Sequence, residues 1–149
     1  MYSTLKEKSI LPRQKNILHE YCMEEWHPII DNNQEIVNVN KGNVIFSEGE
    51  EVKGIHIINK GKVKVFSIYE TNKERIHRLA GDGMILGHRG FGASHYPVSA
   101  VALVNTSVTF IPNEIFKTLI RTNPPLSIYL IDFFAEELRK ADERMKSLM

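Results

Sequence analysis

The residues best suited to chemistry are concentrated in one stretch, "GHRGFGASHYPVS", which runs from Gly87 to Ser99. It holds three glycines, two histidines, an arginine and a proline between two apolar runs. Glycines allow backbone N–H groups to converge on an anion, and an arginine can neutralise that anion. Histidine is also a common metal ligand. The stretch is therefore interpreted as an anion site, a metal site or a long turn, and the surrounding elements decide among these.

Metal binding is one alternative for the histidines. His88 and His95 are preceded in the chain by His77 and His56, and three ligands could converge in space. Cupin-type metalloenzymes, however, use two histidines one residue apart, and no His-x-His occurs here. An axial histidine on a haem is a further alternative. We expect the histidines to be exposed or hydrogen-bonded to the backbone, and we expect no metal and no cofactor.

The bulk properties of the chain exclude several classes of protein. The chain has 149 residues and a formal net charge of +1, which suits a single domain without a strongly basic surface for nucleic acid. The single cysteine, Cys22, excludes an intrachain disulfide and a four-thiolate iron–sulfur cluster within this chain. No signal core and no window of about 18 apolar residues is present, so we expect a cytoplasmic protein. A serine triad has no supporting context, so we assign no catalytic residues and no enzyme activity.

Short strands are expected on both sides of the glycine-rich stretch. From residue 35 the chain is rich in Val and Ile, and turn signals recur about every eight to twelve residues. We expect an antiparallel jelly-roll β-barrel over residues 31–111. In "GIHIINKGKVKVF", Ile55 and Ile57 alternate with His56, which predicts one buried face and one wet face. Gly61 is expected to take a positive φ in the hairpin turn.

Helices are expected to flank these strands. An N-terminal helical segment over residues 1–30 contains "QKNILHEYCMEEW", which predicts one amphipathic helix over 14–26 with Cys22 packed on its apolar face. Pro28 is expected to stop or redirect the chain after this helix. Pro112 opens a short helix over 112–122, and two prolines separate it from a long helix over 124–149.

The long helix has apolar residues on two faces. One of these faces follows steps of three and four residues from Ser127, which is a heptad pattern. We interpret it as the interface of a homodimer, formed by Ile131, Phe134, Leu138, Ala141, Met145 and Leu148. The alternative is a helix folded onto its own barrel. Glu137 and Asp142 would face each other with like charge, which weakens the pairing modestly.

Three segments resemble the sensory half of the Crp/Fnr family of transcription regulators. "GEEVKGIHIINKGKVKVF" resembles the barrel signature of the family, "LAGDGMILGH" resembles the segment before its ligand loop, and "SAVALVNTSVTFIPNEIF" resembles the strands and helix that follow. The resemblance implies one sensor domain over residues 1–149, which dimerises through its last helix. Family members bind DNA through a helix-turn-helix domain, and we expect none in this chain, which we interpret as an excised sensor domain.

The resemblance also identifies what this chain lacks. In cyclic-nucleotide-binding members the ligand loop begins with Gly-Glu, and the glutamate binds the ribose hydroxyl. The loop ends with Arg-Ser or Arg-Ala, and the arginine binds the phosphate. Here Gly87-His88 and Pro97-Val98 stand at those places. We therefore predict no tight binding of cAMP or cGMP. "GFGASHYPVSAVAL" is more similar to the Fnr branch, but one cysteine cannot hold the iron–sulfur cluster of that branch.

An effector in the same pocket, small and either apolar or carboxylate-bearing, remains the leading hypothesis. The expected ligand-binding residues are Gly87, His88, Arg89, Phe91, Pro97, Val98, Ser99 and Phe133. The alternatives are a stand-alone small-molecule-binding module and a cupin-like metalloenzyme.

Overall fold

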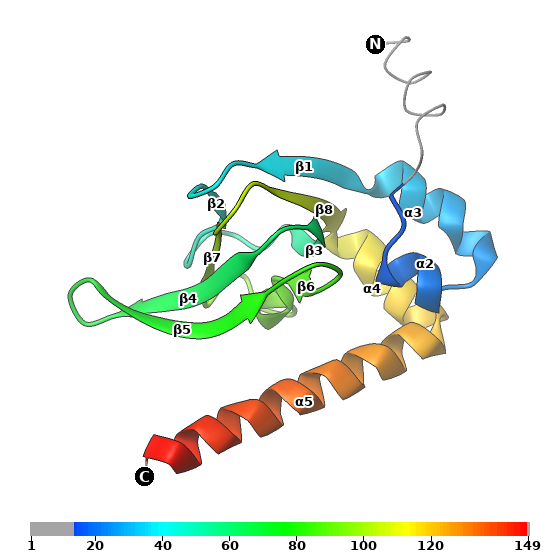
Figure 1. Cartoon of the computed structure of the whole chain (residues 1–149). Coiled ribbons are helices and arrows are strands. Elements are labelled where there is room, and N and C mark those ends of the chain that lie inside the picture. Colours follow the sequence, from blue (N-terminus) through cyan, green and yellow to red (C-terminus); the bar gives the residue numbers. More distant parts are fainter. Residues whose placement is uncertain (1–13, 149) are drawn as a thin grey trace.

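Two antiparallel β-sheets stacked face to face form the body of the molecule (Figure 1). The computed structural model describes residues 14–148. One sheet contains β1 (Glu35–Val39), β8 (Thr106–Pro112), β3 (Gly54–Lys60) and β6 (Ile85–Leu86), in that order. The other contains β2 (Val44–Phe46), β7 (Ser99–Ala102), β4 (Val63–Tyr69) and β5 (Lys73–Ala80). The predicted jelly-roll class is confirmed, with the strands divided between two sheets rather than closed into one barrel.

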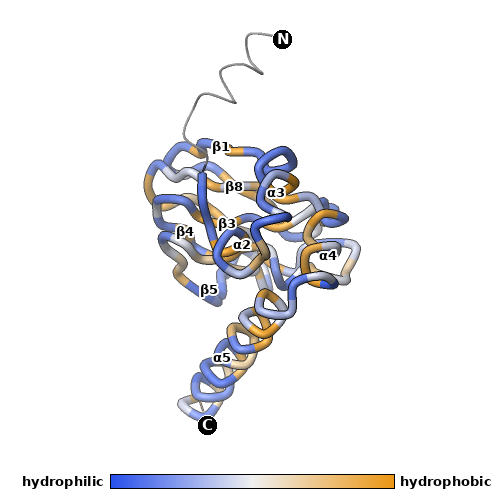
Figure 2. Tube along the Cα trace, turned by 90° about the vertical axis from the view of Figure 1, so that its right-hand side faces the viewer, coloured by the Kyte–Doolittle hydropathy of each residue, from blue (hydrophilic) through white to orange (hydrophobic). Residues whose placement is uncertain are grey.

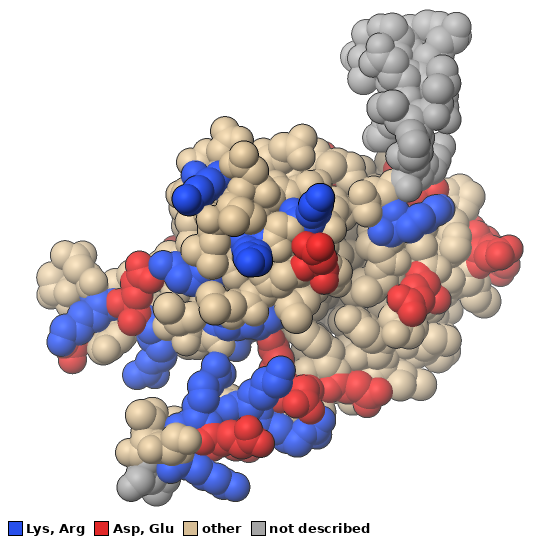
Figure 3. Space-filling view, viewed as in Figure 1, with Lys and Arg blue, Asp and Glu red and all other residues tan. Residues whose placement is uncertain are grey.

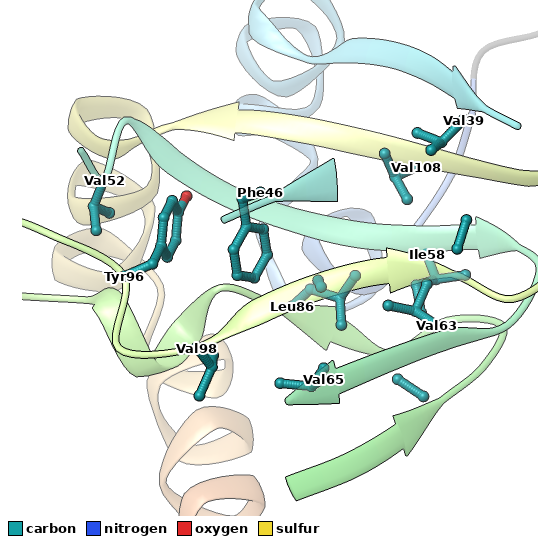
Figure 4. Close-up of a cluster of buried hydrophobic side chains, with 13 residues drawn as sticks. Val39, Phe46, Val52, Ile58, Val63, Val65, Leu86, Tyr96, Val98 and Val108 are labelled. Carbon is teal, nitrogen blue, oxygen red and sulfur yellow. The ribbon is translucent and has the colours of Figure 1, made fainter. Parts of the chain in front are cut away.

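The space between the sheets is filled by one apolar cluster (Figure 4). Its members come from the inward-facing positions of both sheets, because successive side chains of a strand point to opposite faces. Most are β-branched or small, including Val63, Val65, Ala100 and Val108. The recurring Val and Ile residues thus supply most of the side chains that fill the space between the two sheets. Gly61 has a φ of 141° in the β3–β4 turn, as predicted.

β3 departs from the predicted pattern because both of its faces are covered. Ile55 and Ile57 face the helices, and Ile58 faces the opposite sheet. His56, predicted on a wet face, is only 9% exposed and lies on the side of Ile58, between the sheets. The prediction of a solvent-facing His56 was wrong because the opposite sheet covers the face of β3 that carries His56, and the helices cover the other face, so β3 has no wet side.

The N-terminal helices are shorter and more numerous than predicted. Instead of one helix over 14–26, the structure has α2 (Ile17–Tyr21), the 3-10 turn η1 (Glu24–Trp26) and α3 (His27–Asn33). Pro28 lies in the first turn of α3 and so begins a helix rather than stopping one, because a proline in the first turn sacrifices no hydrogen bond. Cys22 is buried as predicted, and burial raises the pKa of its thiol to about 11.

Two helices follow the last strand. Pro112 ends β8 and caps α4 (Asn113–Thr122), and α5 (Pro124–Leu148) begins at the predicted proline pair. Leu126 and Leu130 of α5 are buried in a second apolar cluster, between the outer face of the β3 sheet and the helices. Beyond its first turns, α5 runs alongside the β4–β5 hairpin, and its other side faces away from the body (Figures 1 and 2). None of the helices in the described part of the chain combines the length and apolarity needed to cross a membrane.

Candidate functional site

The glycine-rich stretch begins with a tight turn packed against the end of the sandwich. Gly87 has a φ of 84° and precedes the 3-10 turn η2 (His88–Gly90). A Cβ on Gly90 would lie 2.8 Å from Val52 and 3.0 Å from Tyr96, so only glycine fits there without a shift. These two glycines therefore fix the path of the loop, and the turn at Gly87 is followed by His88, which contacts α5.

His88 connects this loop to α5 through a buried hydrogen bond to a carboxylate. Its Nε2 lies 2.7 Å from Oε2 of Glu137, and the two side chains are 6% and 18% exposed. Arg78 of β5 approaches the other carboxylate oxygen of Glu137, with Nη1 3.3 Å from Oε1. Arg78 also donates through Nη2 to the carbonyl of Ile85 at 2.9 Å. One carboxylate of α5 thus holds a loop side chain and a strand side chain together.

Two aromatic rings of α5 hold this polar contact in place. The His88 ring stacks on Phe134 with the centroids 5.5 Å apart, and it meets Phe133 edge-on at 5.0 Å. The guanidinium of Arg78 lies over the face of Phe133 at 5.1 Å, a cation–π distance. The rings cover part of the charged groups, so the contact between Arg78 and Glu137 is screened less than an ion pair on the open surface.

The protonation states in this contact follow from burial and from the neighbouring charges. Burial lowers the pKa of His88 despite the hydrogen bond and the charge of Glu137. Burial alone would raise the pKa of Glu137, but His88 and the arginines lower it overall. The geometry therefore assigns a neutral imidazole whose Nε2–H donates to an ionised carboxylate. The Nδ1 atom of His88 then has no hydrogen-bond partner among the described residues.

A cleft of about 410 Å³ lies beside this contact, between β5 and α5. Its charged lining comprises Arg78, Arg89, Glu136, Glu137, Lys140 and Arg144. The two glutamates already pair with arginines, Glu136 with Arg139 and Glu137 with Arg78. Arg89 and Lys140 have no ion-pair partner among residues 14–148, and Arg144 donates only to the backbone carbonyl of His77. The cleft therefore carries surplus positive charge suited to a small anion, and Figure 3 shows Lys and Arg gathered along the β4–β5 hairpin and α5.

The expected ligand-binding residues divide into two groups. His88 makes the hydrogen bond to Glu137, and Arg89 and Phe133 line the cleft. Gly87 begins the turn that carries His88 and Arg89. The others lie outside the cleft: Phe91 rests edge-on against Phe116 of α4 at 5.7 Å, Pro97 is exposed and Val98 belongs to the core between the sheets. The Oγ of Ser99 accepts a hydrogen bond from the backbone N–H of Glu48 at 2.7 Å.

The predicted interface residues of α5 are mostly exposed in the single chain. Ile131, Leu138, Met145 and Leu148 are between 60% and 83% exposed. Ala141 and Phe134 are half-buried, and Phe134 packs on His88 of its own loop. Leu138 and Ala141 border a shallow hollow of about 370 Å³ that also contains His88, Arg89 and Glu137. The predicted interface of α5 therefore lies next to the contact between His88 and Glu137, which we call the loop contact.

The histidines and the charged lining of the cleft differ from the sequence-based expectations. The histidines were expected to be exposed or bound to the backbone, but His56 and His88 are buried, and the partner of His88 is a side chain. Sequence reasoning assigned no role to Arg78, Lys140 or Arg144. The spacing of Glu137, Lys140 and Arg144 on one helical face is the signal that could have indicated them.

Within residues 14–148, no group of three or more His, Cys, Asp or Glu side chains is arranged to hold a metal ion.

Comparisons with known proteins agree with this architecture. The profile of the cyclic nucleotide-binding domain family matches residues 36–123. The chain is 31% identical over 134 residues to the fumarate and nitrate reduction regulatory protein of Escherichia coli (strain K12), covering 89% of this chain and 51% of that protein. The chain therefore spans about half the length of this relative.

Solved structures show the same fold. The catabolite activator protein of Thermus thermophilus superposes with a TM-score of 0.74 at 25% identity, covering 88% of this chain and 62% of that one. The sensor domain of the transcriptional regulator DNR from Pseudomonas aeruginosa gives a TM-score of 0.69 at 19% identity, covering 96% and 95%. The chain belongs to the cyclic nucleotide-binding domain family, within the group represented by the Crp/Fnr regulators.

Proposed function

We propose that this chain is the effector-sensing and dimerisation domain of a Crp/Fnr-type transcriptional regulator located in the cytoplasm. The observation that carries the proposal is the buried contact between His88 of the ligand loop and Glu137 of α5. This contact joins the loop that corresponds to the ligand loop of the family to α5, the helix whose apolar face is exposed to solvent. Binding rather than catalysis is the proposed activity, and DNA would be reached only through a helix-turn-helix domain.

The proposed effector is a small anion, held in the cleft between β5 and α5. Arg89 and Lys140 have no ion-pair partner among the described residues, and Arg144 bonds only the backbone carbonyl of His77, so a carboxylate or phosphate there would gain charge-assisted hydrogen bonds. A cyclic nucleotide is a poor candidate. His88 stands where a ribose-binding glutamate is expected, and it is engaged by Glu137. Pro97, at the place of the phosphate-binding arginine, has neither a charge nor a backbone N–H to offer.

Effector binding would act by changing the position of α5. An anion between Arg89 and Lys140 competes with the carboxylates of Glu136 and Glu137 for the neighbouring arginines. It can shift the equilibrium between two α5 positions only by the difference in its affinity for them. Dimerisation through Ile131, Leu138 and Met145 would pass that shift to a second copy, because these side chains are exposed in the single chain.

Calorimetric titration with succinate, inorganic phosphate and cAMP tests the effector class. We expect at least one of the two dianions to bind and cAMP not to bind at micromolar concentrations. Arg89→Gln should weaken dianion binding about fivefold or more, because the cleft then loses one of its unpaired cations. The matched control is Arg121→Gln, which removes an exposed arginine of α4 outside the cleft. Tight cAMP binding, an unchanged dianion affinity in R89Q, or no dianion binding at millimolar concentrations contradicts the proposal.

A further inference from the structure

The cleft between β5 and α5 has an apolar wall that a small inorganic anion would not use. Leu79, Met84 and Phe133 belong to its lining, beside the charged residues. Leu79 is 66% exposed and Met84 is 43% exposed, so much of their apolar surface is in contact with water. Covering such surface is favourable, because apolar area is removed from water on both partners. The cleft therefore offers an apolar contact in addition to its positive charge.

The apolar and the cationic residues are separated along the cleft, because β5 and α5 run in opposite directions. The carbonyl of His77 accepts a hydrogen bond from Nη1 of Arg144 at 2.7 Å. The next residue of β5, Arg78, lies over the ring of Phe133, about three turns before Arg144 in α5. Leu79 continues β5 in the same direction. One end of the cleft is therefore defined by Leu79 and Phe133, and the other end by His77 and Arg144.

The surplus positive charge lies toward the end defined by Arg144. Lys140 follows Phe133 in α5 by about two turns, which is about 10 Å along the helix axis. Burial lowers the pKa of His77, and the charges of Arg89 and Arg144 lower it further, so both guanidinium groups lie near this residue. Arg89 and Lys140 have no ion-pair partner within the described part of the chain. An anionic group fits this end of the cleft, and an apolar group fits the other.

The size and the charge of the cleft disfavour simpler ligands. Its volume of about 410 Å³ falls within the range of roughly 300–1,000 Å³ of pockets that hold small organic molecules. An inorganic anion would leave the side chains of Leu79 and Met84 in water. An uncharged apolar compound would leave the cations without a counter-charge, and an organic cation would be repelled by them. A ligand with a charged part and an apolar part uses both ends of the cleft.

We propose that the effector is an amphipathic anion, with a carboxylate or phosphate-type head at Arg89 and Lys140 and an apolar body of several carbons at Leu79. This inference rests on the proposed anion cleft and adds the chemical class of its ligand. The head selects for negative charge. The body covers the apolar wall, and each methylene that leaves water there strengthens binding about twofold or more.

Two phosphonates that differ only in their apolar part test this class. Methylphosphonate presents the charged head, and hexylphosphonate carries a longer chain on the same head. Hexan-1-ol presents the chain without the charge. In calorimetric titrations at a pH where both phosphonates are doubly charged, hexylphosphonate should bind about tenfold or more tightly than either of the other two compounds. Equal affinities of the two phosphonates would overturn the inference and leave the anion cleft standing, whereas failure of both to bind at millimolar concentrations would refute the cleft and the inference together.

A variant of the apolar wall locates the chain of the ligand. Leu79→Ser should weaken hexylphosphonate binding about threefold, because part of the chain then lies against a hydroxyl group. The matched control is Leu103→Ser, the same change at a leucine that is 37% exposed and lies after β7, outside the cleft. Hexylphosphonate should also shift the methyl resonance of Met84 in a ¹H–¹³C spectrum. Wild-type affinity in L79S, or an unmoved Met84 resonance at saturating hexylphosphonate, would show that the chain does not lie on this wall.

Discussion

At the scale of single residues, two buried histidines are held neutral in different ways. His88 lies against an ionised carboxylate, yet burial prevails and its pKa falls. His56 has no carboxylate in contact, and its pKa falls further, to about 4. A histidine that stays neutral in the folded state but takes up a proton when unfolded makes stability depend on pH.

His56 gives this dependence a definite sign. Its pKa is about 4 when folded and 6.5 in its ordinary state, so between these values the unfolded chain binds more protons than the folded chain. The free energy of unfolding therefore falls as the pH falls from 6.5 to 4, by up to about 3 kcal/mol from this residue. Urea unfolding across this range measures the free energy of unfolding of wild type and of His56→Phe. The difference between the two should become smaller toward pH 4, or change sign so that H56F is the more stable. A difference that does not change with pH would contradict the neutral burial of His56.

Glu137 gives a second residue-scale prediction. Glu137→Gln leaves Arg78, which is 12% exposed, facing a neutral amide. Breaking a largely buried ion pair from one side should lower the free energy of unfolding by about 2 kcal/mol. The control is the adjacent Glu136→Gln, which touches only an exposed arginine and should leave the urea midpoint unchanged. Equal midpoints for E137Q and wild type would show that the contact does not stabilise the fold.

At the scale of elements, the close pairing of β3 with β8 depends on one glycine. A Cβ on Gly54 would overlap the carbonyl oxygen of Ile111 and approach the Phe110 ring. Gly54→Ala should therefore destabilise the protein by about 2–3 kcal/mol, because the strands must separate to admit a methyl group. Gly81→Ala is the matched control, since the nearest atom lies 3.9 Å away and its φ is not positive. Thermal unfolding of both variants checks this, and equal melting temperatures would refute the close approach.

The elements also show how far the sequence alone could lead. The Val and Ile alternation, Gly61 and the proline pair before α5 predicted the strands, a turn and the helix start, because each depends on local chemistry. The wet face assigned to β3 was wrong because the pattern of one strand does not reveal that a second sheet will cover the face that carries His56. The partnership of His88 with Glu137 joins residues 49 positions apart, which no local pattern encodes.

The candidate site was anticipated only in part. Arg89 and Phe133 were expected near a ligand, and they line the cleft. Arg78 was overlooked because it looks like an ordinary solvent-facing residue of an amphipathic strand, and only the position of α5 makes it buried. Pro97, Val98 and Ser99 were assigned by their place in the loop, and the loop turns them to solvent or into the sandwich.

At the scale of the whole molecule, self-association depends on the exposed side of α5. The proposed dimer would cover Leu138, which is 67% exposed in the single chain. Leu138→Glu should raise the dimer dissociation constant about tenfold or more, since a carboxylate would enter an apolar seam. Ile29→Glu makes the same change at an exposed site of α3 and should not affect association. Sedimentation velocity over a range of concentrations measures this, and a wild-type chain that remains monomeric at every concentration would contradict the dimer.

Leu138 follows Glu137 directly in α5, so the surface that would meet a second copy adjoins the loop contact. If self-association alters the strength of effector binding, the effector must alter self-association by the same factor, because the two equilibria form a thermodynamic cycle. The apparent effector affinity would then vary with total protein concentration. Its midpoint would drift between dilute and concentrated samples, and a cell could tune its sensitivity simply by changing how much of the protein it makes.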